Sequence, residues 1–83
     1  MLARVNGEER SRGDVGDMQH TWDAIVAQAA RNTHLVPGDV LGSGTVGTGC
    51  ILELGDGRWL QPGDVVELEV EGLGVLRNAI APR

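Results

Sequence analysis

The sequence contains no lysine, phenylalanine or tyrosine, and its 83 residues include one cysteine and two tryptophans. A Walker-type phosphate loop is excluded because that loop requires a lysine. Cys50 cannot form an internal disulfide, which fits a reducing compartment. Aromatic rings usually fill much of a small core, and a chain this short buries only about 60–65% of its unfolded surface. The scarcity of aromatic rings therefore predicts that the chain is part of a larger structure and packs against it.

Charge is mostly of one sign, and long apolar runs are absent. Twelve acidic residues against seven arginines give a net charge of −5. Such a surface repels phosphate backbones, so we expect no nucleic-acid partner. No apolar run approaches the roughly 18 residues of a membrane span, and the first residues lack the apolar stretch of a signal peptide. These absences predict a cytoplasmic protein with no membrane partner.

The first third of the chain carries signals for a hairpin and a helix. LARV favours a short strand that turns at Asn6 and Gly7, and the following EERSRGDVGD favours a returning edge strand or a loop. Apolar residues then recur with helical spacing, at Trp22, Ile25, Val26 and Ala29. Thr21 can cap this segment and Asn32 can supply a left-handed residue after it, which predicts a helix over about residues 21 to 32.

The second half repeats the pattern L-x-P-G-D-V, at residues 35–40 and 60–65. Pro followed by Gly is typical of a turn, so each copy predicts a turn that launches a strand. After the second copy, aliphatic and acidic residues alternate from Val66 to Glu71, as on a strand with two unlike faces. Gly72-Leu73-Gly74 then predicts a reversal into a last strand. The expected fold class is mainly β with one helix (α+β).

The glycine-rich stretch GSGTVGTGC (42–50) allows two interpretations. Its G-x-G-x-x-G spacing is found in dinucleotide-binding loops, but those loops open a long helix. Here the five residues Cys50–Leu54 precede another glycine and favour a strand, which weakens that interpretation. Glycines also leave backbone amides uncovered. Together with the Thr45 hydroxyl and the Glu53 carboxylate, such a loop suits an anionic, carbonyl-rich substrate.

Four segments together resemble the C-terminal part of the fumarylacetoacetate hydrolase family. They are ARVNGE (3–8), GDMQHTWDAIV (16–26), LVPGDVLGSGTVGTGCILEL (35–54) and LQPGDVVELEVEGLGVLRN (60–78). The resemblance implies the C-terminal part of a mixed β-sandwich roll and metal-dependent hydrolysis of a C–C bond in fumarylacetoacetate-like 1,3-dicarbonyl acids. It also implies a divalent cation, Mg or Ca, in the intact enzyme, and a homodimer.

The same resemblance implies roles for individual residues. The glycine loop would wall the active site, with Ser43, Gly44 and Thr45 binding the substrate and Thr45 contacting its carboxylate or carbonyl. Glu53 would be the catalytic glutamate that partners a histidine to activate water. The family's metal ligands and catalytic histidine lie upstream of these segments, and neither His20 nor His34 occupies that histidine's position.

These departures set the expectation for the chain itself. The Glu67-x-Glu69 pair is better explained as the solvated face of an edge strand than as a metal site, so we expect no metal to bind this segment alone. Residues 1–83 then form a single partial domain, a truncated hydrolase segment that is inactive by itself. Two alternatives stay open: a non-catalytic remnant that folds as a small self-associating β-rich domain, and, less favoured, a nucleotide-binding module.

Overall fold

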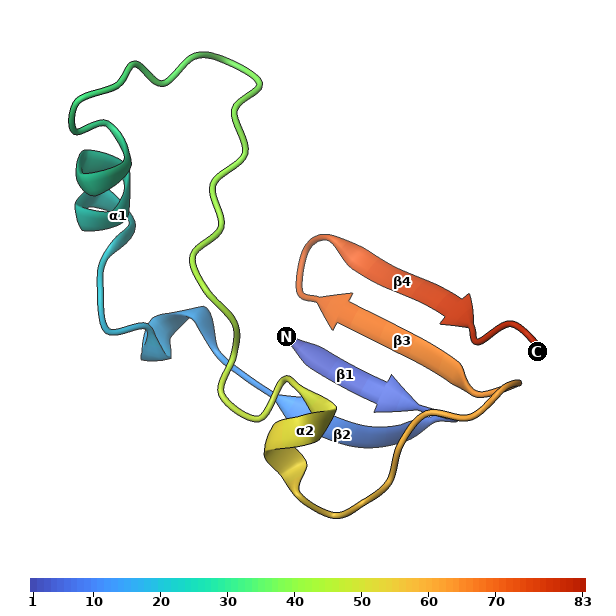
Figure 1. The fold of residues 1–83 in the computed structure, drawn as a ribbon. Coiled ribbons are helices and arrows are strands. Elements are labelled where there is room, and N and C mark those ends of the chain that lie inside the picture. The colour runs from blue at the N-terminus through green and yellow to red at the C-terminus, as the bar shows by residue number, and fades with distance from the viewer.

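The computed structural model describes all 83 residues and contains one four-stranded antiparallel sheet (Figure 1). The strands are β1 (Leu2–Val5), β2 (Glu8–Arg12), β3 (Val65–Val70) and β4 (Gly74–Ala79), and their order is β2-β1-β3-β4. This arrangement confirms the mainly β class. The second sheet that a sandwich roll requires is not among these elements, so the roll stays an expectation for a longer domain.

The hairpin of β1 and β2 forms where the sequence predicts it. Asn6 and Gly7 adopt the positive φ values of 52° and 81° that a tight turn needs. A bulge opposite Ala3 and Arg4 then shifts the register, leaving Arg10 as the extra residue of β2. The returning segment is an edge strand, which was one of the two predicted alternatives.

The position of β3 corrects one prediction. Glu67 and Glu69 were assigned to a solvated edge strand, but β3 lies inside the sheet, between β1 and β4. Residues paired directly across antiparallel strands share a face of the sheet. Glu67 lies opposite Arg4 on β1 and Arg77 on β4, and the Glu69 carboxylate accepts a bond from Arg4 Nη2 at 2.5 Å. The acidic face of β3 is therefore paired with arginines.

The three helices are short. Helix α1 (Trp22–Ala29) begins after Thr21, whose side chain accepts a hydrogen bond from the Ala24 N–H, and it ends three residues earlier than predicted. Asn32 is left-handed as expected, with φ 61°. Figure 1 shows α1 standing away from the sheet. The others are the 3-10 turn η1 (Val15–Asp17) and α2 (Ile51–Leu54), and no helix has the length and apolar character needed to cross a membrane.

Two predicted strands are wrong. Ile51–Leu54 forms one turn of helix, because left-handed Gly55 (φ 63°) follows it and no neighbouring strand offers backbone partners. Val40 and Leu41 are likewise unpaired, and Val40 is 93% exposed. The turns within the two repeats are alike, since Gly38 and Gly63 both have positive φ. Only the second turn is followed by a strand of the sheet.

The chain encloses no core of its own. No residue is fully buried, and the accessible surface is 6708 Å², whereas a compact monomer of this mass exposes about 4,800 Å². The radius of gyration is 16.0 Å, against about 12 Å for a compact chain of this length. The strands pack only on one another, and apolar side chains of α2 and of one sheet face border a shared small cavity. The residues around the small cavity there include Ala3, Val5, Ile51, Leu54, Leu60 and Val66.

Candidate functional site

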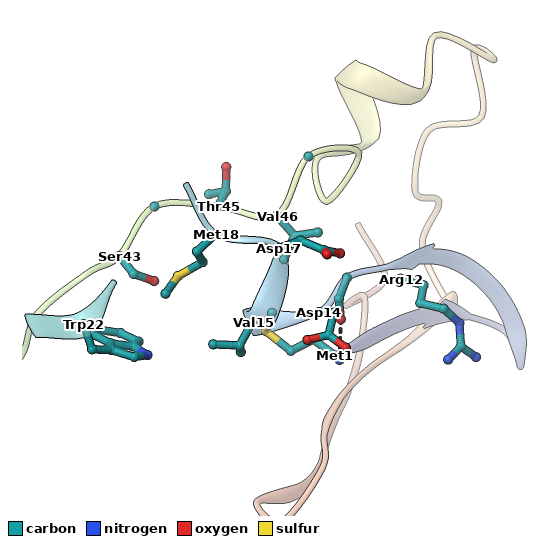
Figure 2. A pocket seen from close by; sticks show the side chains of 13 residues that line it. Met1, Arg12, Asp14, Val15, Asp17, Met18, Trp22, Ser43, Thr45 and Val46 are labelled. Carbon is teal, nitrogen blue, oxygen red and sulfur yellow. Dashed lines mark hydrogen bonds between the residues drawn. The ribbon is translucent and has the colours of Figure 1, made fainter. Parts of the chain in front are cut away.

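A cavity of about 400 Å³ lies between the glycine loop and the segment around η1 (Figure 2). The glycine loop contributes the three predicted substrate-binding residues, Ser43, Gly44 and Thr45. The opposite wall consists of residues from η1 and the start of α1, namely Asp14, Val15, Asp17, Met18 and Trp22. The structure thus gathers the loop residues around one concave space, and its far wall is one that the sequence did not predict.

Contacts of Gly13 and Val46 hold the two walls together. The Val46 side chain lies so close to Gly13 that a Cβ at position 13 would fall 2.4 Å from Val46 Cγ1. Gly13 is fixed in turn by Met1, because the Met1 ammonium donates to the Gly13 carbonyl at 2.8 Å and the Gly13 N–H donates to the Met1 carbonyl at 3.0 Å. The Asp14 carboxylate then accepts from the Gly16 N–H at 2.7 Å and starts η1.

Thr45 lines a second, more apolar cavity as well. This space of about 300 Å³ lies on the sheet side of the glycine loop, over Leu68 and Val70, and Cys50 borders it. Figure 2 shows Ser43 directed into the first cavity, toward Trp22 and Met18, whereas the Thr45 hydroxyl points away from it. The loop therefore borders both cavities, and Ser43 is a side chain that it directs into the first one.

Glu53 has a different position from the one predicted. It lies on α2 instead of a strand, and its carboxylate accepts the backbone N–H of Thr48 at 2.5 Å. Thr48 has a left-handed φ of 67°, so this bond holds a strained residue of the glycine loop. Glu53 lines neither of the cavities that Thr45 lines. The structure ties both residues to one loop but does not bring them into one cavity, and their roles stay predictions.

Ion pairs fasten the segment after α2 onto β2. Arg10 Nη2 lies 3.0 Å from Asp56 Oδ2, and the Arg10 side chain is only 8% exposed. Arg58 donates two bonds to the Glu8 carboxylate, at 2.9 and 2.8 Å. The pKa of Glu8 is lowered by these bonds from Arg58. The pKa of Asp56 is lowered first by the backbone N–H of Arg58 and further by the charge of Arg10.

These ion pairs could not have been identified from the sequence. Glu8 and Arg10 precede their partners by more than 45 residues, and isolated charges of both signs are normal on a protein surface. Their effect is local but relevant to the site, because α2 and the Glu53 carboxylate lie between the glycine loop and this fastened segment.

The donor set of this chain does not fit a metal centre. No three histidine, cysteine, aspartate or glutamate side chains gather where an ion could be held. Glu69 is already paired with Arg4, and a hard cation needs six or more oxygen ligands. His20 lies beside α1, in a separate cavity shared with Gln28 and Gly42, and forms no pair with Glu53.

Comparison with known proteins relates the sequence to a family and to two bacterial relatives. Residues 1–81 match the family described as "Fumarylacetoacetate (FAA) hydrolase C-terminal". An uncharacterized protein of Staphylococcus saprophyticus is 30% identical over 86 residues, covering 100% of this chain and 27% of the relative. An uncharacterized protein of Staphylococcus aureus strain USA300 is 32% identical over 82 residues, covering 98% of this chain and 27% of the relative.

No solved structure matches the chain, so the family assignment depends on sequence alone. The chain spans about a quarter of the length of the curated relatives that it matches. Nearly all of its residues fall within the family match, including the glycine loop, α2 and all four strands. The chain therefore belongs to the fumarylacetoacetate hydrolase family and corresponds to part of its C-terminal domain.

Proposed function

We propose that this chain forms one wall of the substrate site of a C–C bond hydrolase that acts on 1,3-dicarbonyl acids. The observation that carries the proposal is the cavity lined by Ser43, Gly44 and Thr45 in a chain that belongs to this family. A concave space with a few polar groups and apolar walls is the usual form of a small-molecule site. Val15, Met18 and Trp22 supply such an apolar wall.

The glycine loop would bind oxygen atoms of the substrate. Gly44 has a φ of 92° and open space where a side chain would be, so the backbone can approach a ligand closely. Backbone amides can donate hydrogen bonds to a carboxylate or to a carbonyl that becomes an oxyanion. The Thr45 hydroxyl, which points away from the cavity in Figure 2, would have to turn toward it to join them. The net reaction adds hydroxide to one carbonyl carbon and breaks the adjacent C–C bond. The bond's electron pair leaves as an enolate, which then takes a proton.

Glu53 would help a histidine from outside these 83 residues to deprotonate the attacking water. In the structure its carboxylate holds the Thr48 N–H, so Glu53 would have to turn toward the cavity to act on water. Because the residues of this chain do not fit a metal centre, a divalent cation of the intact enzyme would be bound by residues outside the chain. No step assigned to this chain requires that cation.

The decisive experiment supplies the part of the enzyme that the chain does not span. We would co-express the chain with the Staphylococcus saprophyticus relative from which the matched segment has been deleted, and follow acylpyruvate hydrolysis by the loss of enol absorbance. Glu53→Gln should lower kcat about 100-fold or more, as expected when general-base catalysis by the Glu–His pair is lost. Gln keeps an acceptor for the Thr48 N–H, so the loop should keep its structure.

Two further variants make the test specific. Thr45→Val should raise KM or lower kcat, because it removes the hydroxyl and keeps the shape of the side chain. Glu71→Gln is the matched control, since Glu71 is an exposed acid in the β3–β4 turn that lines neither cavity, and it should leave the rate unchanged. Full activity of Glu53→Gln would contradict its catalytic role, and no hydrolysis by any complemented protein would contradict the proposed function.

A second candidate function is favoured by the exposed aliphatic surface. Val40, Leu52, Leu73 and Leu76 are all more than 60% exposed, and the surface exceeds that of a compact monomer by about 1,900 Å². A non-catalytic chain could cover this surface by forming a homodimer. Sedimentation equilibrium at micromolar concentration distinguishes the two functions: a folded dimer without hydrolase activity after complementation would support this one.

A further inference from the structure

Along the outer edge of β4, the backbone groups of alternate residues are unpaired, and the pairing with β3 shows which residues these are. The Ile80 N–H donates to the Asp64 carbonyl at 2.8 Å, and the register continues from there in antiparallel pairs. Alternate residues of an antiparallel strand are bonded to its neighbour, so Leu76 and Asn78 face β3. The N–H and C=O groups of Val75, Arg77 and Ala79 point outward, where no other strand of these 83 residues pairs with β4. We call these three residues the open β4 edge.

The two edges of the sheet differ in how they are protected. On β2, four of the five residues are charged and a bulge interrupts the register, which are two common devices against strand addition. On β4, one residue of six is charged, the pairing with β3 is regular along its whole length, and every residue is exposed. Only the open β4 edge is a regular template with a single charge for another strand.

A row of alternating charges crosses the sheet and ends at this edge. Directly paired residues along the row are Glu9 on β2, Arg4 on β1, Glu67 on β3 and Arg77 on β4. Opposite charges in direct cross-strand positions attract, and like charges repel. Arg77 makes no ion pair within the chain. An acidic residue opposite Arg77, on a strand added to this edge, would therefore continue the alternation.

The opposite face of the same strand presents Leu76 between Gly74 and Asn78. Leu76 is 62% exposed and lies directly across from Leu68, which is also exposed. An added strand has the same alternation, because successive side chains point to opposite faces. An acid opposite Arg77 would thus be flanked by one residue beside Leu76 and one beside Asn78, and an aliphatic residue would cover Leu76.

We propose that the open β4 edge receives an extended strand of a partner protein, in which an acid lies opposite Arg77 and an aliphatic residue lies beside Leu76. A second copy of β4 fits poorly, because Arg77 is its only charged residue and no acid would meet it. The proposal concerns recognition of a strand and holds whichever reaction the domain supports.

Amide hydrogen exchange of the full 15N-labelled chain can test the proposal. The probe is an end-capped peptide of seven residues in which valine and glutamate alternate, and the matched peptide has lysine in place of glutamate. The glutamate peptide should slow exchange of the Val75, Arg77 and Ala79 amides, and it should bind about fivefold or more tightly than the lysine peptide. A glutamate peptide with N-methylated backbone should give no protection, because it cannot extend the ladder.

Reversal of the charge at position 77 provides the second part of the test. Arg77→Glu should reverse the preference so that the lysine peptide binds more tightly, and Arg77→Gln should remove the preference while retaining backbone-driven binding. Equal protection by both peptides of wild type would overturn the charge assignment. Protection of the three amides that grows with protein concentration in the absence of peptide would assign the edge to a second copy instead. Rapid exchange throughout the sheet, even with peptide, would also overturn the proposal. Strand addition requires that β4 be formed before the peptide binds.

Discussion

Gly13→Ala should destabilise the protein through a single contact. Position 13, which follows β2, lies against the Val46 side chain of the glycine loop. The added Cβ would lie 2.4 Å from Val46 Cγ1 and 3.0 Å from Val46 Cγ2, whereas carbon atoms in favourable contact are about 3.5–4.0 Å apart. The loop or the Val46 side chain must therefore move by roughly 1 Å. Overpacking of this kind costs about 1–3 kcal/mol, and replacing glycine returns about 0.4–1 kcal/mol by restricting the unfolded chain.

The expected net loss in the free energy of unfolding is about 1–2 kcal/mol. With a urea dependence of about 1 kcal/mol per M for a small protein, the midpoint should fall by about 1–2 M. Tryptophan fluorescence can follow unfolding, because Trp22 lines the cavity next to this contact. Protein concentration must be held fixed, since association would shift the apparent stability.

A double-mutant cycle makes the result specific. Val46→Ala removes the clashing methyl groups, so Gly13→Ala should cost little in that background, and the coupling should be about 1–2 kcal/mol. Gly49→Ala is the matched contrast, because its Cβ would meet the Val46 backbone oxygen at 2.8 Å, which Val46→Ala leaves in place. Gly47→Ala meets nothing within 4 Å and should be neutral. Additive costs for Gly13→Ala and Val46→Ala would refute the contact that holds the cavity walls together.

Two further predictions concern the ionised groups. The pKa of Asp64 is lowered, chiefly by the Gln61 N–H and next by the Asn6 side chain, so its contribution to stability is complete above the ordinary aspartate pKa and is lost as the pH falls through the lower folded value. Asp64→Asn should therefore weaken the dependence of the urea midpoint on pH below about pH 4, and an unchanged acid slope would contradict this. Asp56→Asn keeps an acceptor for the Arg58 N–H but loses the charge opposite Arg10. Added 1 M NaCl should shift Trp59 fluorescence in wild type by loosening this segment, and should shift it less in the variant.

Local signals in the sequence predicted the parts of the fold that depend on near neighbours. The Asn6-Gly7 turn, the Thr21 cap and the alternation along β3 all depend on residues within one turn or one strand. The position of β3 in the sheet could not be predicted in this way. It depends on pairing with β1, about 60 residues away, and a strand has the same alternation at an edge as inside an antiparallel sheet.

The same distinction explains the candidate site. The glycine loop was identified from its composition, and Ser43, Gly44 and Thr45 do line a cavity. The segment Cys50–Leu54 is short and aliphatic, a pattern that fits a strand or a helix turn equally, and the left-handed Gly55 together with the lack of a pairing strand decided the outcome. The bond from Thr48 to Glu53 and the ion pairs of Arg10 and Arg58 are tertiary contacts, so no spacing along the chain signals them.

The pairing of β1 with β3 has a consequence for biosynthesis. Leu2–Val5 lie beside Val66–Glu69, so the first strand leaves the ribosome long before its inner neighbour has been translated. At about 5–20 residues per second, that delay is roughly 3–12 s. Closing a loop of this length also costs about 3–4 kcal/mol of chain entropy. Only the β1–β2 hairpin is ready at the start, and a nascent chain that stalls before β3 presents it to chaperones and proteases without its neighbour.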